Sequence, residues 1–358
     1  MSFDLKKLIV DVFHPEADEV ILVLVDEPLE SKDDHPLWLQ RRQMAQKWHE
    51  TFEILSKEIG FSTLPLLSYP ATCKHNYDLD LSTGSPISLN EAFEKASLVV
   101  ALTEYSATAT LAKLTDKKKD FRAASMPLAE KRMEQTALSA DYKEIARRCQ
   151  VLVECLEDAQ SCELAFSTGH KMFFDLRYNE VRFEDGQLPR NKKGLRVVNL
   201  PSGEVSKVPY EGEKYGDPSK TEGQIPVMYE QEIIVHDVKK NRIVNTFGDG
   251  NQALIWHEFF SLDPARCNIA EFGIGCNPRA IVTGNLLEDE KSGFHWSYGR
   301  SDFLGGITYP HNFKKPAYVV HTPVIYAVES PIQIDSLVLN YEGNLSKMII
   351  KEKSFIIF

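Results

Sequence analysis

The sequence has few cysteines, and they lack the spacing of a disulfide framework or a zinc site. Its six cysteines are scattered over 358 residues, and no two of them form a C-x-x-C pair. The first residues also lack an apolar signal core, because Asp4, Lys6 and Lys7 follow Met1 closely. Both absences predict a cytoplasmic protein whose thiols stay reduced.

Long apolar runs and an excess of positive charge are absent as well. The longest apolar blocks, such as Val20 to Val25, are far shorter than the ~20 residues that cross a bilayer. The 41 basic and 52 acidic residues give a formal charge of -11, and no basic stripe offsets it. A phosphate backbone would be repelled by such a chain. We therefore expect neither a membrane nor a nucleic acid as a partner.

Several familiar catalytic and nucleotide-binding motifs are missing. His257-Glu258 begins like the H-E-x-x-H motif of zinc peptidases, but Ser261 stands where the second histidine belongs. The sequence also has no G-x-S-x-G elbow and no Walker loop. Asp26-Glu27-Pro28 follows the first strand pattern in place of a glycine-rich dinucleotide fingerprint. The first half is therefore not expected to bind a nucleotide.

What the sequence does contain is a globular composition, 43% hydrophobic and 26% charged, with alternating strand and helix patterns in its first half. The largely apolar run Glu19–Asp26 is typical of a strand buried in a parallel sheet, and Pro36–Ile59 has the periodicity of an amphipathic helix. The alternation continues through a further helix expected to begin at Pro127 and ends at the strand pattern Cys162–Phe166. This order predicts a doubly wound parallel-sheet α/β domain over residues 1–165.

The second half changes period. Lys171–Arg182 and Leu195–Val208 alternate like half-buried strands, and one helix is expected at Asn251–Phe260. Tyr210–Gly223 is a long polar loop, and loops of this length inside a domain are often lids or binding loops. A mixed α+β domain over residues 166–358 follows.

The stretch from Cys267 to Gly306 gathers the chemically active residue types. Glu271 lies within an apolar segment and beside the glycine turn Gly273-Ile-Gly275, so its carboxylate is expected to be buried. Buried carboxylates are normally paired or bound to metal. An acidic cluster, Glu288 to Glu290, and then His295 follow. Carboxylates and imidazoles beside glycine turns predict a metal site.

Short motifs along the chain are similar, in order and spacing, to those of the aminopeptidase T (leucyl aminopeptidase) metallopeptidase family. They are Asn199-Leu-Pro-Ser-Gly-Glu204-Val, Ala270-Glu271-Phe-Gly-Ile-Gly-Cys-Asn277-Pro278, Gly284-Asn285-Leu-Leu-Glu288-Asp289-Glu290-Lys291, His295 and Gly305-Gly306. Tyr105-Ser106 and Ser125-Met126-Pro127 extend the similarity into the first half. The resemblance therefore spans most of the chain.

This resemblance implies a homodimeric metallo-aminopeptidase that acts on a peptide or small-molecule substrate, with a divalent metal (Zn, Co or Mn) as cofactor. Carried over by motif, the ligands are Glu204, Glu271, Glu290, His295 and His321. Glu271 and Glu204 are also expected to be catalytic, since a carboxylate not used by the metal can act as general base. Taken singly, these residues have structural interpretations: Glu204 as a turn acid, Glu290 as surface charge and His295 as a hydrogen-bonded core residue.

The chain departs from the family pattern after His321, where an Asp is expected two residues on and Pro323 stands. The missing ligand predicts one tightly bound ion rather than two. A related branch of the fold cleaves hydroxylated pyridine rings with a single Fe(II), and Trp296 and Tyr298 could stack on such a planar substrate. Three functions stay open: an aminopeptidase, an Fe(II)-dependent ring-cleaving dioxygenase, and an inactive descendant that binds without turnover.

Overall fold

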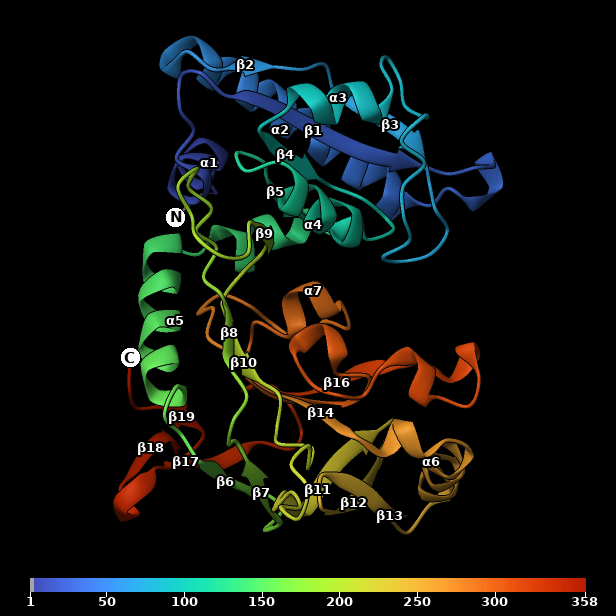
Figure 1. Cartoon of the computed structure of the whole chain (residues 1–358), viewed down its shortest axis with the longest axis vertical. Helices are drawn as coiled ribbons and strands as arrows, with labels where there is room; N and C mark the ends of the chain where they lie inside the picture. Colours follow the sequence, from blue (N-terminus) through green and yellow to red (C-terminus); the bar gives the residue numbers. More distant parts are fainter. Residues whose placement is uncertain (1–2) are drawn as a thin grey trace. The chain divides into compact units, whose positions relative to one another are not determined.

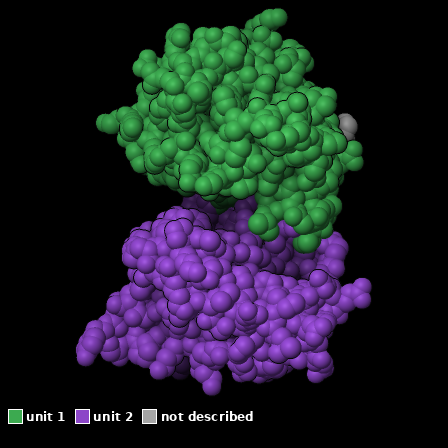
Figure 2. All heavy atoms as spheres, turned by 90° about the vertical axis from the view of Figure 1, so that its right-hand side faces the viewer, with its two compact units in different colours: residues 1–146, 184–203, 277–288 green, residues 147–183, 204–276, 289–358 purple. Residues whose placement is uncertain are grey.

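The computed structural model describes residues 3–358, which form two compact units, coloured green and purple in Figure 2. Unit 1 runs up to Ala146 and takes in residues 184–203 and 277–288, and unit 2 holds residues 147–183, 204–276 and 289–358. The units are discontinuous in sequence, whereas the expected domains are contiguous. The division at residues 165 and 166, as a statement about independently folding domains, stays a prediction.

Unit 1 is built on a six-stranded parallel sheet, and the α/β class expected for the first half is confirmed (Figure 1). Its strands are β1 (Val20–Glu27), β2 (Ser62–Thr63), β3 (Leu67–Pro70), β4 (Leu98–Ala101), β5 (Arg122–Ser125) and β9 (Val197–Asn199). Its helices are α1 (Leu5–Phe13), α2 (Pro36–Ile59), α3 (Leu89–Lys95) and α4 (Thr108–Lys117). Leu22 and Leu24 of β1 pack with residues of α3 and α4, while α2 also packs on β1, so helices cover both faces of the sheet.

The bounds of α2 follow from its sequence. Pro36 is at the first helical position, where its fixed φ suits the helix, and the His35 ring accepts a hydrogen bond from the Trp38 backbone N–H. Gly60 ends the helix in the left-handed conformation with φ of 103°, which glycine adopts without strain. The helix predicted at Pro36–Ile59 is confirmed, and so is the strand predicted at Glu19–Asp26, which the structure has one residue later at both ends.

Two predicted elements were wrong, one in each half of the sequence. The segment after Pro127 forms only short 3-10 turns, η2 (Lys131–Glu134) and η3 (Ala137–Ser139), instead of a helix. The expected strand Leu195–Val208 is two strands, because the chain turns at Pro201 and Gly203 and the second part joins a different sheet. Proline cannot donate to a ladder, and Gly203 adopts a φ of 117°.

Unit 2 contains two antiparallel sheets. The eight-stranded sheet runs β13 (Arg242–Phe247), β12 (Glu232–Lys239), β11 (Glu222–Tyr229), β7 (Lys171–Asp175), β6 (Ser161–Phe166), β17 (Ile334–Asn340), β18 (Ser346–Lys351) and β19 (Ser354–Phe355). The five-stranded sheet, sheet C, runs β16 (His321–Tyr326), β15 (Phe294–Gly299), β14 (Ile269–Gly275), β10 (Glu204–Lys207) and β8 (Val181–Glu184). The helices that complete the chain are α5 (Tyr142–Leu156), α6 (Asn251–Leu262) and α7 (Leu286–Asp289).

An aromatic core joins these two sheets. Phe174 of the larger sheet packs against Phe272 and Phe294 of sheet C, with ring centroids 5.2 and 6.0 Å apart. Phe166 packs against Tyr326 in the same way. One face of sheet C is therefore committed to the core. No helix within residues 3–358 is long and apolar enough to cross a membrane.

A buried ion pair in unit 1 links β5 to Glu19, the residue that precedes β1. The Arg122 guanidinium on β5 binds the Glu19 carboxylate through contacts of 2.6 and 2.8 Å, and it also donates to the Phe13 carbonyl at 2.6 Å. The side chains of Arg122 and Glu19 are only 1% and 0% exposed. A buried charge without its partner is strongly unfavourable, so each group depends on the other.

Replacing Arg122 by Met should therefore lower the free energy of unfolding by about 3 to 5 kcal/mol, because Glu19 would be left buried and unpaired. The matched control is Lys95→Met, which removes the exposed i,i+4 pair with Glu91 and should cost less than about 1 kcal/mol. Urea denaturation of both variants checks the difference. Similar losses in the two variants would contradict the role of burial.

Candidate metal centre

The register of sheet C places four of the five predicted ligands, all except Glu290, on one face. Glu204 of β10 pairs with Gly275 of β14, and Gly273 of β14 pairs with His295 of β15. Glu271 lies two residues before Gly273, so its side chain projects to the same side. His321 of β16 pairs with Gly299 of β15, two steps along from Ser297, which pairs with Glu271. Antiparallel pairing thus brings together residues that lie far apart in sequence.

The alternate residues of these strands project to the opposite face. Phe272 pairs with Trp296, and Trp296 pairs with Val324, all of them away from the carboxylates. The Trp296 ring N–H donates to the Tyr326 hydroxyl at 3.2 Å, and Tyr298 packs against Phe260. The suggestion that Trp296 and Tyr298 stack on a substrate at the metal site is therefore wrong. Both rings belong to the core.

The glycine turn expected at Gly273-Ile-Gly275 is wrong, because both glycines belong to the strand β14, and each of them makes room for part of the site. A Cβ on Gly273 would lie 2.1 Å from Nε2 of His295, so the imidazole ring covers this glycine. A Cβ on Gly275 would lie 2.4 Å from the Glu290 carbonyl oxygen and 2.6 Å from the Ser292 nitrogen. The segment that carries Glu290 therefore crosses directly over β14. A larger residue at position 273 would displace the His295 ring, and one at position 275 would displace the segment that carries Glu290.

Three of the predicted ligands form a compact buried group. One ligand atom from each of Glu204, Glu271 and His295 lies within 4.8 Å of the others, and the three residues are 8%, 4% and 0% exposed. Oε1 of Glu204 is 3.2 Å from Nε2 of His295. Two carboxylate oxygens and an imidazole nitrogen at this spacing are a donor set that suits a divalent metal.

His321 joins this group through Glu271. Its Nε2 is 3.2 Å from Oε2 of Glu271, and the same oxygen accepts a hydrogen bond of 2.8 Å from the Ser297 hydroxyl. Its Nδ1 is 2.7 Å from the Arg300 carbonyl oxygen, an acceptor, so Nδ1 carries the proton. In His295, Nδ1 is 3.4 Å from the Gly293 carbonyl oxygen. Both rings thus turn Nε2 toward a carboxylate, the orientation seen in metal-binding histidines.

Lys291 is a residue of the site that the sequence analysis did not assign. Its buried ammonium group contacts Oε2 of Glu204 and lies 3.7 Å from Oε2 of Glu290. Glu290, with a side chain 24% exposed, therefore reaches the group of three through Lys291. The signal available in the sequence was the position of the lysine, next to a predicted ligand and within the motif. A lysine beside an acidic run usually points to solvent, whereas here the backbone of Lys291 crosses Gly275 and its side chain is buried against Glu204.

Burial and mutual charge shift the pKa values of these groups. Burial raises the pKa of Glu290 to about 7, and the nearby negative charge of Glu204 adds to this effect. Burial alone would lower the pKa of His295, but its hydrogen bond to Glu204 raises it to about 9. Burial opposes ionisation of Glu204, yet Lys291 and His295 hold the pKa of that carboxyl well below its usual range. The face is therefore a strongly coupled set of charges.

The polar loop predicted at Tyr210–Gly223 is anchored at its start. Tyr210 is buried, and the Glu211 carboxylate accepts hydrogen bonds from the Ser301 hydroxyl at 2.7 Å and the Ile307 N–H at 2.6 Å. Tyr215, in contrast, is fully exposed. Glu211 thus ties the loop to the Gly305-Gly306 turn, a link that its position in a polar stretch gave no reason to expect.

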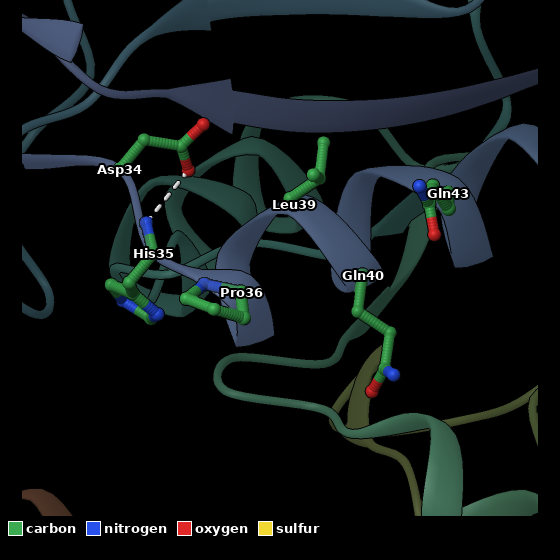
Figure 3. Close-up of a pocket in the computed structure, with 6 residues that line it drawn as sticks. All are labelled: Asp34, His35, Pro36, Leu39, Gln40 and Gln43. Carbon is green, nitrogen blue, oxygen red and sulfur yellow. Dashed lines mark hydrogen bonds between the residues drawn. The ribbon is translucent and has the colours of Figure 1, made fainter.

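A groove in unit 1 contains none of the predicted ligands. It has a volume of about 410 Å³ and lies along the start of α2, where the Asp34 carboxylate accepts a hydrogen bond of 3.0 Å from the His35 backbone N–H (Figure 3). Its lining residues are Asp34, His35, Pro36, Leu39, Gln40 and Gln43. The metal-ligand residue types converge in unit 2 instead.

Comparison with known proteins places the fold. No protein-family model and no curated protein matches the chain. The structure of 2,5-dihydroxypyridine dioxygenase from Pseudomonas putida KT2440 matches with a TM-score of 0.64 at 16% identity, over 98% of this chain and 96% of that one. Wild-type AmpT from Thermus thermophilus, an aminopeptidase T, matches with a TM-score of 0.59 at 12% identity, over 99% and 98%. Both neighbours are enzymes, and the fold is compatible with either chemistry.

Replacing Gly273 by Ala should force the His295 ring to move, because the new methyl group would overlap it. We expect a loss of about 1 to 3 kcal/mol in the free energy of unfolding, the usual cost of overpacking, and shifted ring resonances of His295 in NMR spectra. Gly248→Ala is the comparison variant: its Cβ would come within 3.1 Å of the Ile233 carbonyl oxygen, a milder crowding, so its loss should be smaller and the His295 resonances should stay in place. Unchanged His295 resonances in Gly273→Ala would refute the close contact.

Proposed function

We propose that this chain is a metal-dependent aminopeptidase that removes N-terminal residues from peptides. The observation that carries the proposal is the buried group of Glu204, Glu271 and His295, whose ligand atoms lie within 4.8 Å of one another. The motif resemblance to the aminopeptidase T family and the fold shared with AmpT support it. The opposite face of sheet C is filled with aromatic core, so the polar face is the one available for chemistry.

The residues present fit a divalent metal. Glu204, Glu271 and His295 would supply the main ligands. The Nε2 atom of His321 is directed to the Glu271 carboxylate. The backbone carbonyls of Gly293 and Arg300 orient the two imidazole rings, and such supporting hydrogen bonds strengthen metal binding. A bound ion of this kind lowers the pKa of its water to about 7 and polarises a carbonyl group.

The remaining charged groups have roles that follow from their places. Glu290 lies outside the group of three and is the carboxylate left to accept a proton or to hold the ammonium group of a peptide substrate. Ser297 fixes Glu271 through its hydrogen bond of 2.8 Å, which keeps that carboxylate in one orientation. Glu204 and Glu271 thus act at the metal, and Glu290 acts beside it.

An Fe(II)-dependent ring-cleaving dioxygenase is the second candidate. The observation that favours it is the set of His295, His321 and Glu271, because two histidines and one carboxylate are typical ligands of non-haem Fe(II) in oxygenases. The fold is shared with a 2,5-dihydroxypyridine dioxygenase. The aromatic rings that would have supported this candidate point away from the site.

Metal loading followed by two activity assays separates the candidates. The metal-stripped protein is reconstituted with Zn, Co or Mn and assayed with aminoacyl p-nitroanilides, and separately with Fe(II) under anaerobic conditions and assayed for oxygen uptake with 2,5-dihydroxypyridine. We expect peptide-bond hydrolysis and no oxygen uptake. Oxygen uptake with 2,5-dihydroxypyridine by the Fe(II)-loaded protein, and by no other metal form, would establish the second candidate. Bound metal with neither activity would favour an inactive descendant.

Glu271→Gln should weaken metal affinity by on the order of 10- to 100-fold, because it removes the negative charge of a carboxylate that would be a ligand and that also contacts His321 and Ser297. Isothermal titration with Zn measures the change. Glu329→Gln, an exposed acid in the same unit, should leave the affinity unaltered. Equal affinity in the two variants would remove Glu271 from the ligand set.

The assembly is proposed from the resemblance. A homodimer is expected, with the polar loop at Tyr210–Gly223 helping to enclose the site from a second subunit. Tyr215 at the exposed part of this loop offers a ring for such a contact. Light scattering should give twice the chain mass of 40.7 kDa at micromolar concentration. A mass of one chain there would rule the homodimer out.

A further inference from the structure

The ammonium group of Lys291 is a buried positive charge beside the carboxylates of the candidate metal centre. Its side chain is 3% exposed, and its ammonium group contacts Glu204 and lies 3.7 Å from Glu290. A buried ammonium is tolerated only where negative groups surround it. The backbone of Glu290–Ser292 packs directly on Gly275, because a Cβ added to this glycine would lie only 2.4 to 2.6 Å from its atoms. This close packing fixes the position of the Lys291 backbone.

The two carboxylate oxygens of Glu204 contact different side chains, His295 and Lys291. Oε1 lies 3.2 Å from Nε2 of His295, within the group of three, while Oε2 contacts the Lys291 ammonium. In two-metal hydrolases a carboxylate commonly bridges ions that lie about 3.5 to 4 Å apart. Glu204 has the form of such a bridge, with an ammonium group at one of its ends.

The charges of the face support the same arrangement. Glu204, Glu271 and Glu290 carry three negative charges when ionised, and one ammonium with one divalent ion neutralises them. A second divalent ion would leave an excess of positive charge in a buried site, which is costly. Pro323, opposite Ser297 in the register, also offers no carboxylate to a second ion.

We propose that the Lys291 ammonium takes the place of a second metal ion, so that the centre holds one divalent ion and one lysine. This inference rests on the proposed function and specifies the composition of its metal centre. It assigns Lys291 a positioning role: the ammonium fixes Glu204 and excludes a second ion. The site is thus mononuclear because a side chain occupies the other position.

The test counts Mn²⁺ per chain in the wild type, Lys291→Met, Lys291→Arg and the exposed control Lys347→Met. Elemental analysis after dialysis in buffered Mn²⁺ and isothermal titration give stoichiometry and affinity. We expect one ion in the wild type, Lys291→Arg and Lys347→Met, and two in Lys291→Met, where Glu204 and Glu290 lose their cation. Adding Pro323→Asp to Lys291→Met should tighten the second ion by on the order of 10-fold or more.

The outcomes separate this inference from the proposed function. One ion in both the wild type and Lys291→Met overturns the inference and leaves the metalloenzyme intact. No ion in the wild type but one or more in Lys291→Met overturns the proposed function, and it also overturns the inferred composition of one ion and one lysine. No ion in any variant overturns both, and two ions in the wild type overturn the inference alone.

A measurement on the wild type guards against a variant that fails to fold. Anomalous diffraction from Mn²⁺-loaded crystals should show one metal peak per chain, with the Lys291 ammonium still between Glu204 and Glu290. Two peaks, with Lys291 turned out of the site, would refute the inference. Circular dichroism of each variant shows beforehand whether its fold is retained.

Discussion

The burial of carboxylates on one face of sheet C is the constraint on which the centre depends. Glu204 and Glu271 are almost removed from solvent, and such groups stay ionised only beside compensating positive charge or hydrogen-bond donors. Each neighbour answers that need: Ser297 donates to Glu271, Lys291 contacts Glu204, and both histidines turn Nε2 inward. The polar residues on this face are therefore those that compensate the charge of the buried carboxylates.

Strand alternation lets the same strands serve two purposes. Residues of β14 and β15 contribute in turn to the charged face and to the aromatic core, so Phe272 and Phe294 pack against Phe174 while their neighbours hold the centre. All seven residues of β14 are buried. The core thus gives the carboxylates a rigid support, which precise coordination requires.

The sequence alone predicted the elements whose causes are local. The caps and periodicity of α2 and the apolar run of β1 gave their positions, and the apolar surroundings of Glu271 predicted its burial. It did not predict that residues 195–208 divide between two sheets, because pairing partners distant in sequence decide this. The same limitation applied to Lys291, whose inward direction depends on a chain crossing over Gly275, and to Trp296, whose face depends on strand register.

The strand order of sheet C also bears on biosynthesis. β10 precedes its partner β14, which begins 65 residues after β10 begins, and β16 with His321 follows nearer the C-terminus. A ribosome releases these segments in that order, so a nascent chain exposes Glu204 long before the imidazoles that accompany it exist. The full donor set is assembled only when synthesis is nearly complete. A ligand that needs all of these residues can consequently bind only late in the synthesis of each molecule.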